Sequence, residues 1–291
     1  MTKGNPGAGR LRTALLIAAS AALLAYAGIV VFLALSENAL VYVSAGEGRR
    51  GRPVPAEDAP IPWDTLRVPA ADGVPVFLLV SRVDTSSRRP WAIFFHGNAG
   101  MVGSGSSVAR YALLREAGFD VLAPEYRGYG AASGSGPVTE DGVYADARAA
   151  LAYLVDSLRV PSRRIVAYGW SLGSGPAARL AAEHDLGALI TEGGFTSLPD
   201  VGAELYPWVP VRMIMRNRFD NFALVTRIEE PWIVFHGRRD SEIPFAHGEA
   251  LALAGPTARL VPLDAEHDDG VIADRVTALR ELRQIAGGLA N

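Results

Sequence analysis

The chain contains no cysteine among its 291 residues. This absence excludes a disulfide scaffold, a cysteine-ligated zinc site, an iron–sulfur cluster, a cysteine nucleophile and lipidation at a lipobox cysteine. Lysine is almost as scarce, because Lys3 is the only one in the sequence. A Schiff base on a lysine of the folded part is therefore excluded as well.

Positive charge is scarce beyond the N-terminus. Residues 1–35 contain Lys3, Arg10 and Arg12 and no acidic residue, and the remaining residues carry 25 basic and 31 acidic side chains. Nucleic-acid-binding proteins neutralise phosphates with clustered lysine and arginine, so this balance predicts no nucleic-acid partner. No His/Asp/Glu cluster has metal-ligand spacing, and nucleotide-binding motifs are missing, so neither a metal nor a cofactor is expected.

The segment from Ala14 to Leu35 has 22 residues and no charge. As a helix it is about 33 Å long, enough to cross the roughly 30 Å hydrocarbon core of a bilayer. We expect residues 1–13 to be a short basic cytoplasmic tail and residues 14–35 a transmembrane signal anchor, which places the main domain outside the cytoplasm. The alternative is a cleaved signal peptide and secretion, since Ala25-Tyr26-Ala27 resembles a cleavage site.

Residues 36–62 are rich in glycine and proline and are expected to form a tether, or a lead-in along the domain surface. Residues 63–291 form one domain in which strand and helix patterns alternate, which indicates an α/β fold with a mostly parallel sheet and helices on both faces. The predicted strands are 65–68, 76–81, 91–95, 119–123, 164–168, 188–191, 232–235 and 258–262, and the predicted helices are 107–117, 139–158, 172–184, 245–253 and 268–286.

The segment Gly169-Trp170-Ser171-Leu172-Gly173 follows a predicted strand and opens a predicted helix. This is the context that a G-x-S-x-G nucleophile turn requires. The turn holds the serine in a strained conformation, so the residues two positions away must lack a β-carbon. The helix amides that follow favour a developing oxyanion. Ser171 is therefore the predicted nucleophile.

A serine hydroxyl needs a base, and the sequence has five histidines. His267 lies in the loop between the last strand and the last helix, which is a strand end within reach of Ser171, so it is the predicted base. His96 and His236 each sit in a strand-end His-Gly pair and are expected to hydrogen-bond loop backbone. Asp240 follows the strand 232–235 and gives the order Ser, Asp, His along the chain, so it is the predicted acid.

Glu242 and Asp264 are the rivals for the acid. The loop from His96 to Gly100 follows a buried strand, and its backbone can face the serine. The N–H groups of Asn98 and Leu172 are the predicted oxyanion hole, with Ala99 as the alternative to Asn98.

Taken together, these motifs resemble the α/β-hydrolases, specifically the membrane-anchored α/β-hydrolase-domain serine hydrolases that include protein depalmitoylases and uncharacterised bacterial members. The resemblance implies an α/β-hydrolase fold and the same triad and oxyanion amides. Two segments depart from the family pattern, Ala265-Glu266 before the base and Glu192-Gly193-Gly194 before the insertion. The matching segments are His96-Gly97-Asn98-Ala99-Gly100, Tyr126-Arg127-Gly128-Tyr129-Gly130, Gly169-Trp170-Ser171-Leu172-Gly173, Phe195-Thr196-Ser197, His236-Gly237 with Asp240, and His267.

Residues 197–230 separate two strands and form a cap-like insertion with many apolar residues. Trp170, Tyr206, Trp208 and Met213 are expected to line a substrate pocket for a small-molecule or lipid-like acyl group. The alternative is a helix that packs its apolar side on the core.

The predicted function is hydrolysis of a carboxylic ester or thioester through an acyl-enzyme. A serine peptidase or amidase with the same triad, and a non-catalytic membrane-tethered binding module, remain open. The oligomeric state is left unpredicted.

Overall fold

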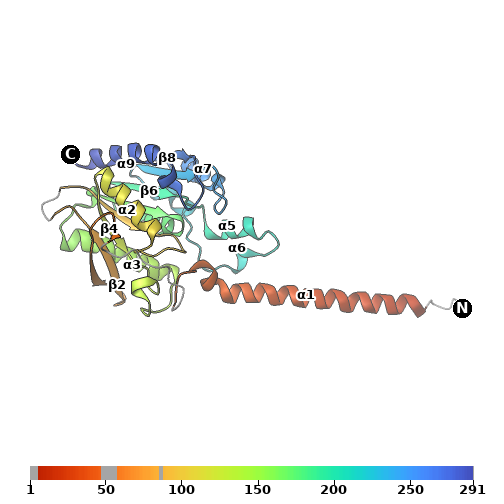
Figure 1. The fold of residues 1–291 in the computed structure, drawn as a ribbon. Coiled ribbons are helices and arrows are strands. Elements are labelled where there is room, and N and C mark those ends of the chain that lie inside the picture. The colour runs from red at the N-terminus through yellow and green to blue at the C-terminus, as the bar shows by residue number, and fades with distance from the viewer. Residues whose placement is uncertain (1–5, 47–57, 85–87, 291) are drawn as a thin grey trace.

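The computed structural model describes residues 6–46, 58–84 and 88–290 (Figure 1). One sheet of eight strands has the order β1-β2-β4-β3-β5-β6-β7-β8. Strand β2 is antiparallel to both β1 and β4, and all the other pairs are parallel. The strands are β1 (Asp64–Pro69), β2 (Pro75–Ser81), β3 (Trp91–Phe95), β4 (Asp120–Pro124), β5 (Ile165–Trp170), β6 (Ala188–Glu192), β7 (Trp232–Gly237) and β8 (Ala258–Leu263).

The central strands are buried on both faces, as expected for parallel strands covered by helices. In β3 every residue is buried, and successive side chains enter different cores because strand side chains alternate. Ile93 and Phe95 belong to one hydrophobic cluster, whereas Ala92 and Phe94 belong to the other. Helices α3, α4 and α7 supply residues to the first cluster, and α2, α8 and α9 supply the second. These helices are α2 (Gly105–Ala117), α3 (Glu140–Ala152), α4 (Ser174–Glu183), α7 (Phe245–Ala254), α8 (Gly270–Ala273) and α9 (Arg275–Ala290).

This arrangement confirms the predicted α/β fold with helices on both faces of a mostly parallel sheet. One predicted helix differs in the structure, because residues 268–286 form two helices that separate at Asp274. The Asp274 carboxylate accepts a hydrogen bond from the Thr277 N–H, 3.4 Å away. A short polar side chain that bonds nearby backbone favours a helix start over a helix interior, which explains the break.

Helix α1 (Pro6–Val41) has 36 residues and projects from the domain (Figure 1). Its stretch from Arg10 to Val41 contains an 18-residue window with a mean hydropathy of 2.4 and is long and apolar enough to cross a membrane. The predicted span 14–35 lies within it. The structure differs from the tether expected from residue 36, because the helix continues to Val41 and Tyr42 is buried. Residues 47–57 of the predicted tether lie outside the described residues.

The end of α1 is bonded into the domain. The Glu37 carboxylate, which is 4% exposed, accepts hydrogen bonds from the backbone N–H groups of Arg216 (2.9 Å) and Asn217 (2.7 Å). Tyr42 donates from its hydroxyl to the Asn217 side chain over 2.7 Å. A carboxylate is buried at a tolerable cost only when it is well hydrogen-bonded, so these contacts explain why the chain does not leave the domain at residue 36.

The insertion between β6 and β7 contains α5 (Leu198–Leu205), α6 (Val211–Ile214) and a 3₁₀ segment, Phe222–Arg227. The part of the insertion next to the sheet is held beside α4, the helix that follows Ser171. The Asn221 amide donates to Ser174 Oγ over 3.1 Å and to the Phe195 carbonyl over 3.0 Å. The insertion, which we call the cap, is therefore anchored next to the predicted nucleophile.

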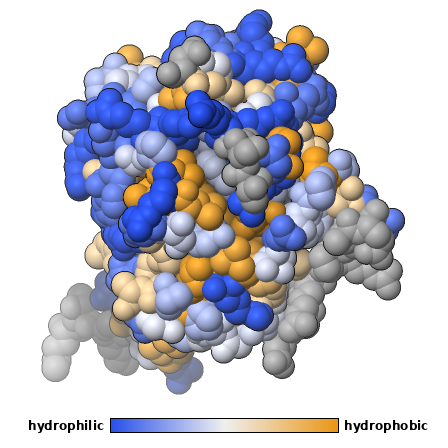
Figure 2. Space-filling model, turned by 90° about the vertical axis from the view of Figure 1, so that its left-hand side faces the viewer, coloured by the Kyte–Doolittle hydropathy of each residue, from blue (hydrophilic) through white to orange (hydrophobic). Residues whose placement is uncertain are grey.

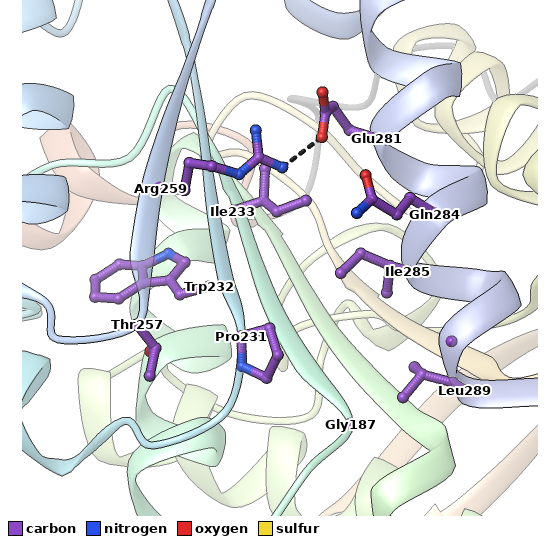
Figure 3. A pocket seen from close by; sticks show the side chains of 11 residues that line it. Gly187, Pro231, Trp232, Ile233, Thr257, Arg259, Glu281, Gln284, Ile285 and Leu289 are labelled. Carbon is purple, nitrogen blue, oxygen red and sulfur yellow. Dashed lines mark hydrogen bonds and ion pairs between the residues drawn. The ribbon is translucent and has the colours of Figure 1, made fainter.

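A surface hollow of about 380 Å³ lies between α9 and the loops that precede β6, β7 and β8 (Figure 3). Pro231 and Thr257 come from those loops, and Ile285 and Leu289 come from α9. The side of the molecule shown in Figure 2, from which α1 points away, combines hydrophobic patches with hydrophilic margins. Ligands of such sheets bind at the carboxyl ends of the strands. The hollow lies at the amino ends, so we assign it no part in the site.

Candidate active site

Ser171 sits on a sharp turn between β5 and α4, with φ of 52° in the left-handed region. The chain passes very close to itself there. A β-carbon on Gly169 would lie 2.3 Å from the Gly173 carbonyl oxygen, and one on Gly173 would lie 2.1 Å from the Phe95 carbonyl oxygen. Real β-carbons never approach so closely, so both positions require glycine. This confirms the steric reason for the G-x-S-x-G pattern.

The structure brings Ser171, His267 and Asp240 together. The Ser171 hydroxyl lies 2.9 Å from His267 Nε2, and His267 Nδ1 lies 2.7 Å from Asp240 Oδ2. All three side chains are buried or nearly so, with Ser171 9% exposed and His267 5% exposed. With the proton on Nδ1, the imidazole donates to the carboxylate and accepts from the serine. This is the geometry in which a histidine can take the serine proton.

Asp240 is held by its own loop. Its Oδ1 accepts hydrogen bonds from the backbone N–H groups of Glu242 (3.0 Å) and Ile243 (2.7 Å), which leaves Oδ2 for His267. The two rival acids are placed elsewhere. Glu242 Oε2 lies 3.9 Å from Nε2 and is largely exposed, and Asp264 is an exposed partner of Arg239. Of the three acids, Asp240 is the one that bonds to Nδ1.

Two opposed effects act on the pKa of His267. Burial lowers the pKa, because it penalises the charged imidazolium, but the hydrogen bond and the negative charge of Asp240 raise it. The net result is a pKa above the ordinary value of 6.5. A base that holds a proton more firmly than free imidazole is suited to accept one from a hydroxyl group.

The predicted oxyanion segments lie beside the serine. A β-carbon on Gly97 would lie 3.4 Å from Ser171 Cβ, so the turn after β3 packs directly against the nucleophile. The Tyr129 hydroxyl donates to the Asn98 carbonyl over 3.1 Å and fixes this turn. Leu172 lies in the 3₁₀ turn Ser171–Gly173, directly before α4. The backbone that carries the Asn98 and Leu172 amides is thus near Ser171.

Sequence reasoning missed a buried cluster that supports the base. The Arg110 guanidinium donates to both Glu192 oxygens, over 2.8 and 2.7 Å, and to the Asp268 carbonyl over 3.0 Å. Glu192 also accepts from the Val271 N–H over 3.0 Å. These bonds tie α2 and β6 to the segment that follows His267. An arginine within the otherwise apolar, buried face of α2 was the available signal, since such a charge needs a buried partner.

The four predicted pocket residues lie in two different environments, one buried and three exposed. Trp170 is buried, with its ring 3.8 Å from the Arg110 guanidinium and its N–H 3.4 Å from the His267 carbonyl. The other three lie on the cap and are exposed. Tyr206 is 53% exposed, Trp208 54% and Met213 87%. Their lining of a pocket stays a prediction, and the structure places them outward.

Three other histidines, His96, His236 and His247, contact backbone groups of nearby loops. His96 Nδ1 lies 2.8 Å from the Gly97 carbonyl and His236 Nε2 lies 2.9 Å from the Ile243 carbonyl, which confirms that both bond to loop backbone. His247 Nδ1 accepts from the Thr196 N–H over 3.2 Å, at the start of the cap. In the described ranges, 6–46, 58–84 and 88–290, no group of three or more histidine or acidic residues is arranged to hold a metal ion.

Comparisons with known proteins agree with this geometry. An alpha/beta hydrolase fold family matches residues 90–225. An uncharacterized protein of Mycobacterium tuberculosis is 31% identical over 275 residues, which cover 93% of this chain and 94% of that protein. The chain belongs to the α/β-hydrolase family. This α/β-hydrolase is also 32% identical over 159 residues to alpha/beta hydrolase domain-containing protein 17B of Homo sapiens, covering 55% of this chain and 53% of that protein.

Solved structures share the fold of this α/β-hydrolase. The Pyrococcus furiosus esterase Pf2001 superposes with a TM-score of 0.69 at 19% identity, covering 84% of this chain and all of that one. Est1E from Butyrivibrio proteoclasticus superposes with a TM-score of 0.61 at 18% identity, covering 77% and 98%. At this level of identity the likeness extends to the fold.

Proposed function

We propose that this α/β-hydrolase is a serine hydrolase that cleaves a carboxylic ester or thioester. The observation that carries the proposal is the pair of contacts through His267, 2.9 Å to Ser171 and 2.7 Å to Asp240. A buried serine on a strained turn, bonded to a histidine that is itself oriented by a carboxylate, is the arrangement that activates a hydroxyl group.

In the proposed reaction, Ser171 Oγ attacks the substrate carbonyl while its proton passes to His267 Nε2. Asp240 holds the imidazole through Nδ1 and stabilises the imidazolium. The N–H groups of Asn98 and Leu172 donate to the oxyanion of the tetrahedral intermediate. His267 then gives the proton to the leaving alcohol or thiol, and an acyl-serine remains. Water, deprotonated by the same imidazole, releases the acid and restores the serine.

The preference for esters over amides is supported by the names of solved structures that share the fold. Solved structures with this fold include esterases, and an ester leaving group departs without the strong protonation that an amine needs. No cofactor enters any step, because the triad generates the nucleophile itself.

The test is labelling of the full chain in membranes by a fluorophosphonate, which reacts with activated serines. We expect the wild type to label and Ser171→Ala and His267→Ala to lose labelling. Ser162→Ala is the matched control, since Ser162 lies near the other end of the same strand and should not matter. Equal labelling of wild type and Ser171→Ala would make Ser171 the wrong nucleophile. Absent labelling of all variants would favour the non-catalytic binding module.

The position of the domain is part of the proposal. We infer that α1 is a signal anchor and that the domain lies outside the cytoplasm, because Lys3, Arg10 and Arg12 precede the apolar run. The chain has no cysteine, so Val276→Cys introduces a single thiol on exposed α9. A membrane-impermeant maleimide should label it in intact cells. Labelling only after lysis would reverse the orientation, and recovery of the thiol in the soluble fraction would indicate cleavage.

A further inference from the structure

The end of α5, helix α6 and the turn between them carry an exposed surface that is mostly apolar. We call residues 205–214 the cap tip; Arg212 is their only charged residue. Leu205, Tyr206 and Trp208 are each more than half exposed, and Met213 is 87% exposed. Soluble surfaces rarely gather large apolar side chains in this way, so the cap tip requires a partner.

The cap also lies along α1 (Figure 1). Glu37 accepts from the backbone of residues 216–217, and the Arg216 guanidinium donates to the Ala34 carbonyl over 3.3 Å. Farther along the helix, the Tyr26 hydroxyl donates to the Trp208 carbonyl over 2.8 Å. These contacts lie on α1 between Tyr26 and Glu37, which are eleven positions apart, or about 16 Å along the helix axis. The cap tip therefore reaches down the same helix that is apolar enough to cross a membrane.

The position of Tyr26 gives the depth of this contact. Tyr26 is nine residues before Leu35, the last residue of the uncharged segment 14–35, which is about 14 Å along the helix. The hydrocarbon of one leaflet is about 15 Å thick. When α1 spans a bilayer, Tyr26 lies well inside that leaflet, and the Trp208 carbonyl lies beside it. We propose that the cap tip inserts into the hydrocarbon of the leaflet on the domain side.

Much of the irregular backbone of the cap tip is paired within the protein. In hydrocarbon, each unpaired N–H or C=O group costs several kcal/mol, so irregular backbone must satisfy itself. Pro207 and Pro210 have no N–H group, and the Trp208 carbonyl is satisfied by Tyr26. Three further N–H groups donate to carbonyls of residues 202–209 over 2.8–2.9 Å, namely those of Tyr206, Val209 and Val211.

The charges around the cap tip mark the upper limit of insertion. Arg212 pairs with Asp200 over 2.9 Å, at the end of the cap nearer the domain. Arg216, which pairs with Glu37, is 69% exposed on its side chain. Long arginine side chains reach the headgroup region while their stems cover apolar surface. A lipid leaflet therefore matches the cap tip in polarity and in level.

Because the wild type lacks cysteine, single thiols report position directly. We would place an environment-sensitive nitrobenzoxadiazole label at Met213→Cys and, separately, at Trp208→Cys in the full chain, reconstituted into phosphatidylcholine vesicles. Leu24→Cys in α1 is the membrane control, and Val276→Cys on α9 is the aqueous control; both positions are exposed, 73% and 82%. Nitroxide groups on lipid acyl chains and aqueous iodide serve as the two quenchers.

We expect the labels at 213 and 208 to behave like the label at 24, with blue-shifted emission, quenching by acyl-chain nitroxide and protection from iodide. Quenching by iodide as strong as at 276 would overturn the proposal. Protection from iodide without nitroxide quenching would also overturn it, because the cap tip would then be covered by protein, either a second copy or another chain. The readout needs no catalysis, so its outcome is independent of the proposed function.

Discussion

Gly193 faces His267 so closely that a β-carbon on Gly193 would lie 3.0 Å from Cε1 of the imidazole and 3.1 Å from Nδ1. Gly193 also has φ of 55°, which favours glycine. It belongs to the segment 192–194 that departs from the family pattern. The absence of a side chain at residue 193 leaves the space in which the imidazole meets Asp240, so this glycine positions the base.

Gly193→Ala should therefore reduce esterase activity by about 100-fold, because a displacement of the base by less than 1 Å costs that much in a preorganised site. The measurement is kcat/KM on a short-chain nitrophenyl ester. Gly105→Ala is the control, since a β-carbon there meets nothing within 4 Å. Unchanged activity of Gly193→Ala would show that the imidazole tolerates a side chain against its face.

The pH dependence should report the charge of Glu242. The reaction needs neutral His267, so activity falls as the pH drops through the pKa of His267, which Asp240 and Glu242 raise. Glu242→Gln removes a charge 3.9 Å from Nε2. A pair at this distance in water is worth about 1 kcal/mol, so the acid limb should move to lower pH by roughly half a unit, and less at high salt. Glu249→Gln, another exposed acid, should leave the profile unchanged.

The backbone at Ser171 should show its strain in stability measurements. The left-handed conformation costs a residue with a β-carbon about 1–2 kcal/mol and costs glycine almost nothing. Ser171→Gly should therefore unfold at a higher denaturant concentration than Ser171→Ala, although both are inactive. At Ser174, whose φ is −61°, the order should reverse. Equal midpoints for the two variants at residue 171 would contradict the strain.

The Arg110–Glu192 pair should matter for stability much more than an exposed pair. Both side chains are nearly inaccessible, at 1% and 2%. Arg110→Met would leave Glu192 buried and unpaired, and the free energy of unfolding should fall by about 3–5 kcal/mol. Arg148→Met breaks an exposed pair with Glu183 and should cost less than about 1 kcal/mol. Chemical denaturation measures both, and adding Glu192→Met to Arg110→Met should restore part of the loss.

The triad could be predicted from the sequence because each member follows a strand. Trp170, Gly237 and Leu263 end β5, β7 and β8, which are parallel, so the loops after them meet at one edge. Chain order then gave Ser171, Asp240 and His267 the roles that we propose for them, without knowledge of any distance. The fold could be predicted because apolar periodicity and turn residues indicate each strand and helix locally.

What could not be predicted depends on contacts between distant segments. Glu37 finds its partners 179 and 180 residues away, so nothing near it in sequence showed that α1 would be bonded to the cap. The outward position of Met213 had the same cause. Its apolar side chain suited a pocket or a helix packed on the core about equally well, and its 87% exposure depends on the path of the cap in the folded chain.

The rigid joint at Glu37 has a consequence for how the protein meets its substrate. With α1 in a bilayer, the hydrogen bonds from residues 216–217 to Glu37 hold the domain against the end of the helix. They restrict the orientation of the domain relative to the membrane. A substrate in that membrane then approaches by diffusion in two dimensions. Its encounter rate depends on the number of molecules per unit area of lipid, and dilution of the surrounding solution leaves that number unchanged.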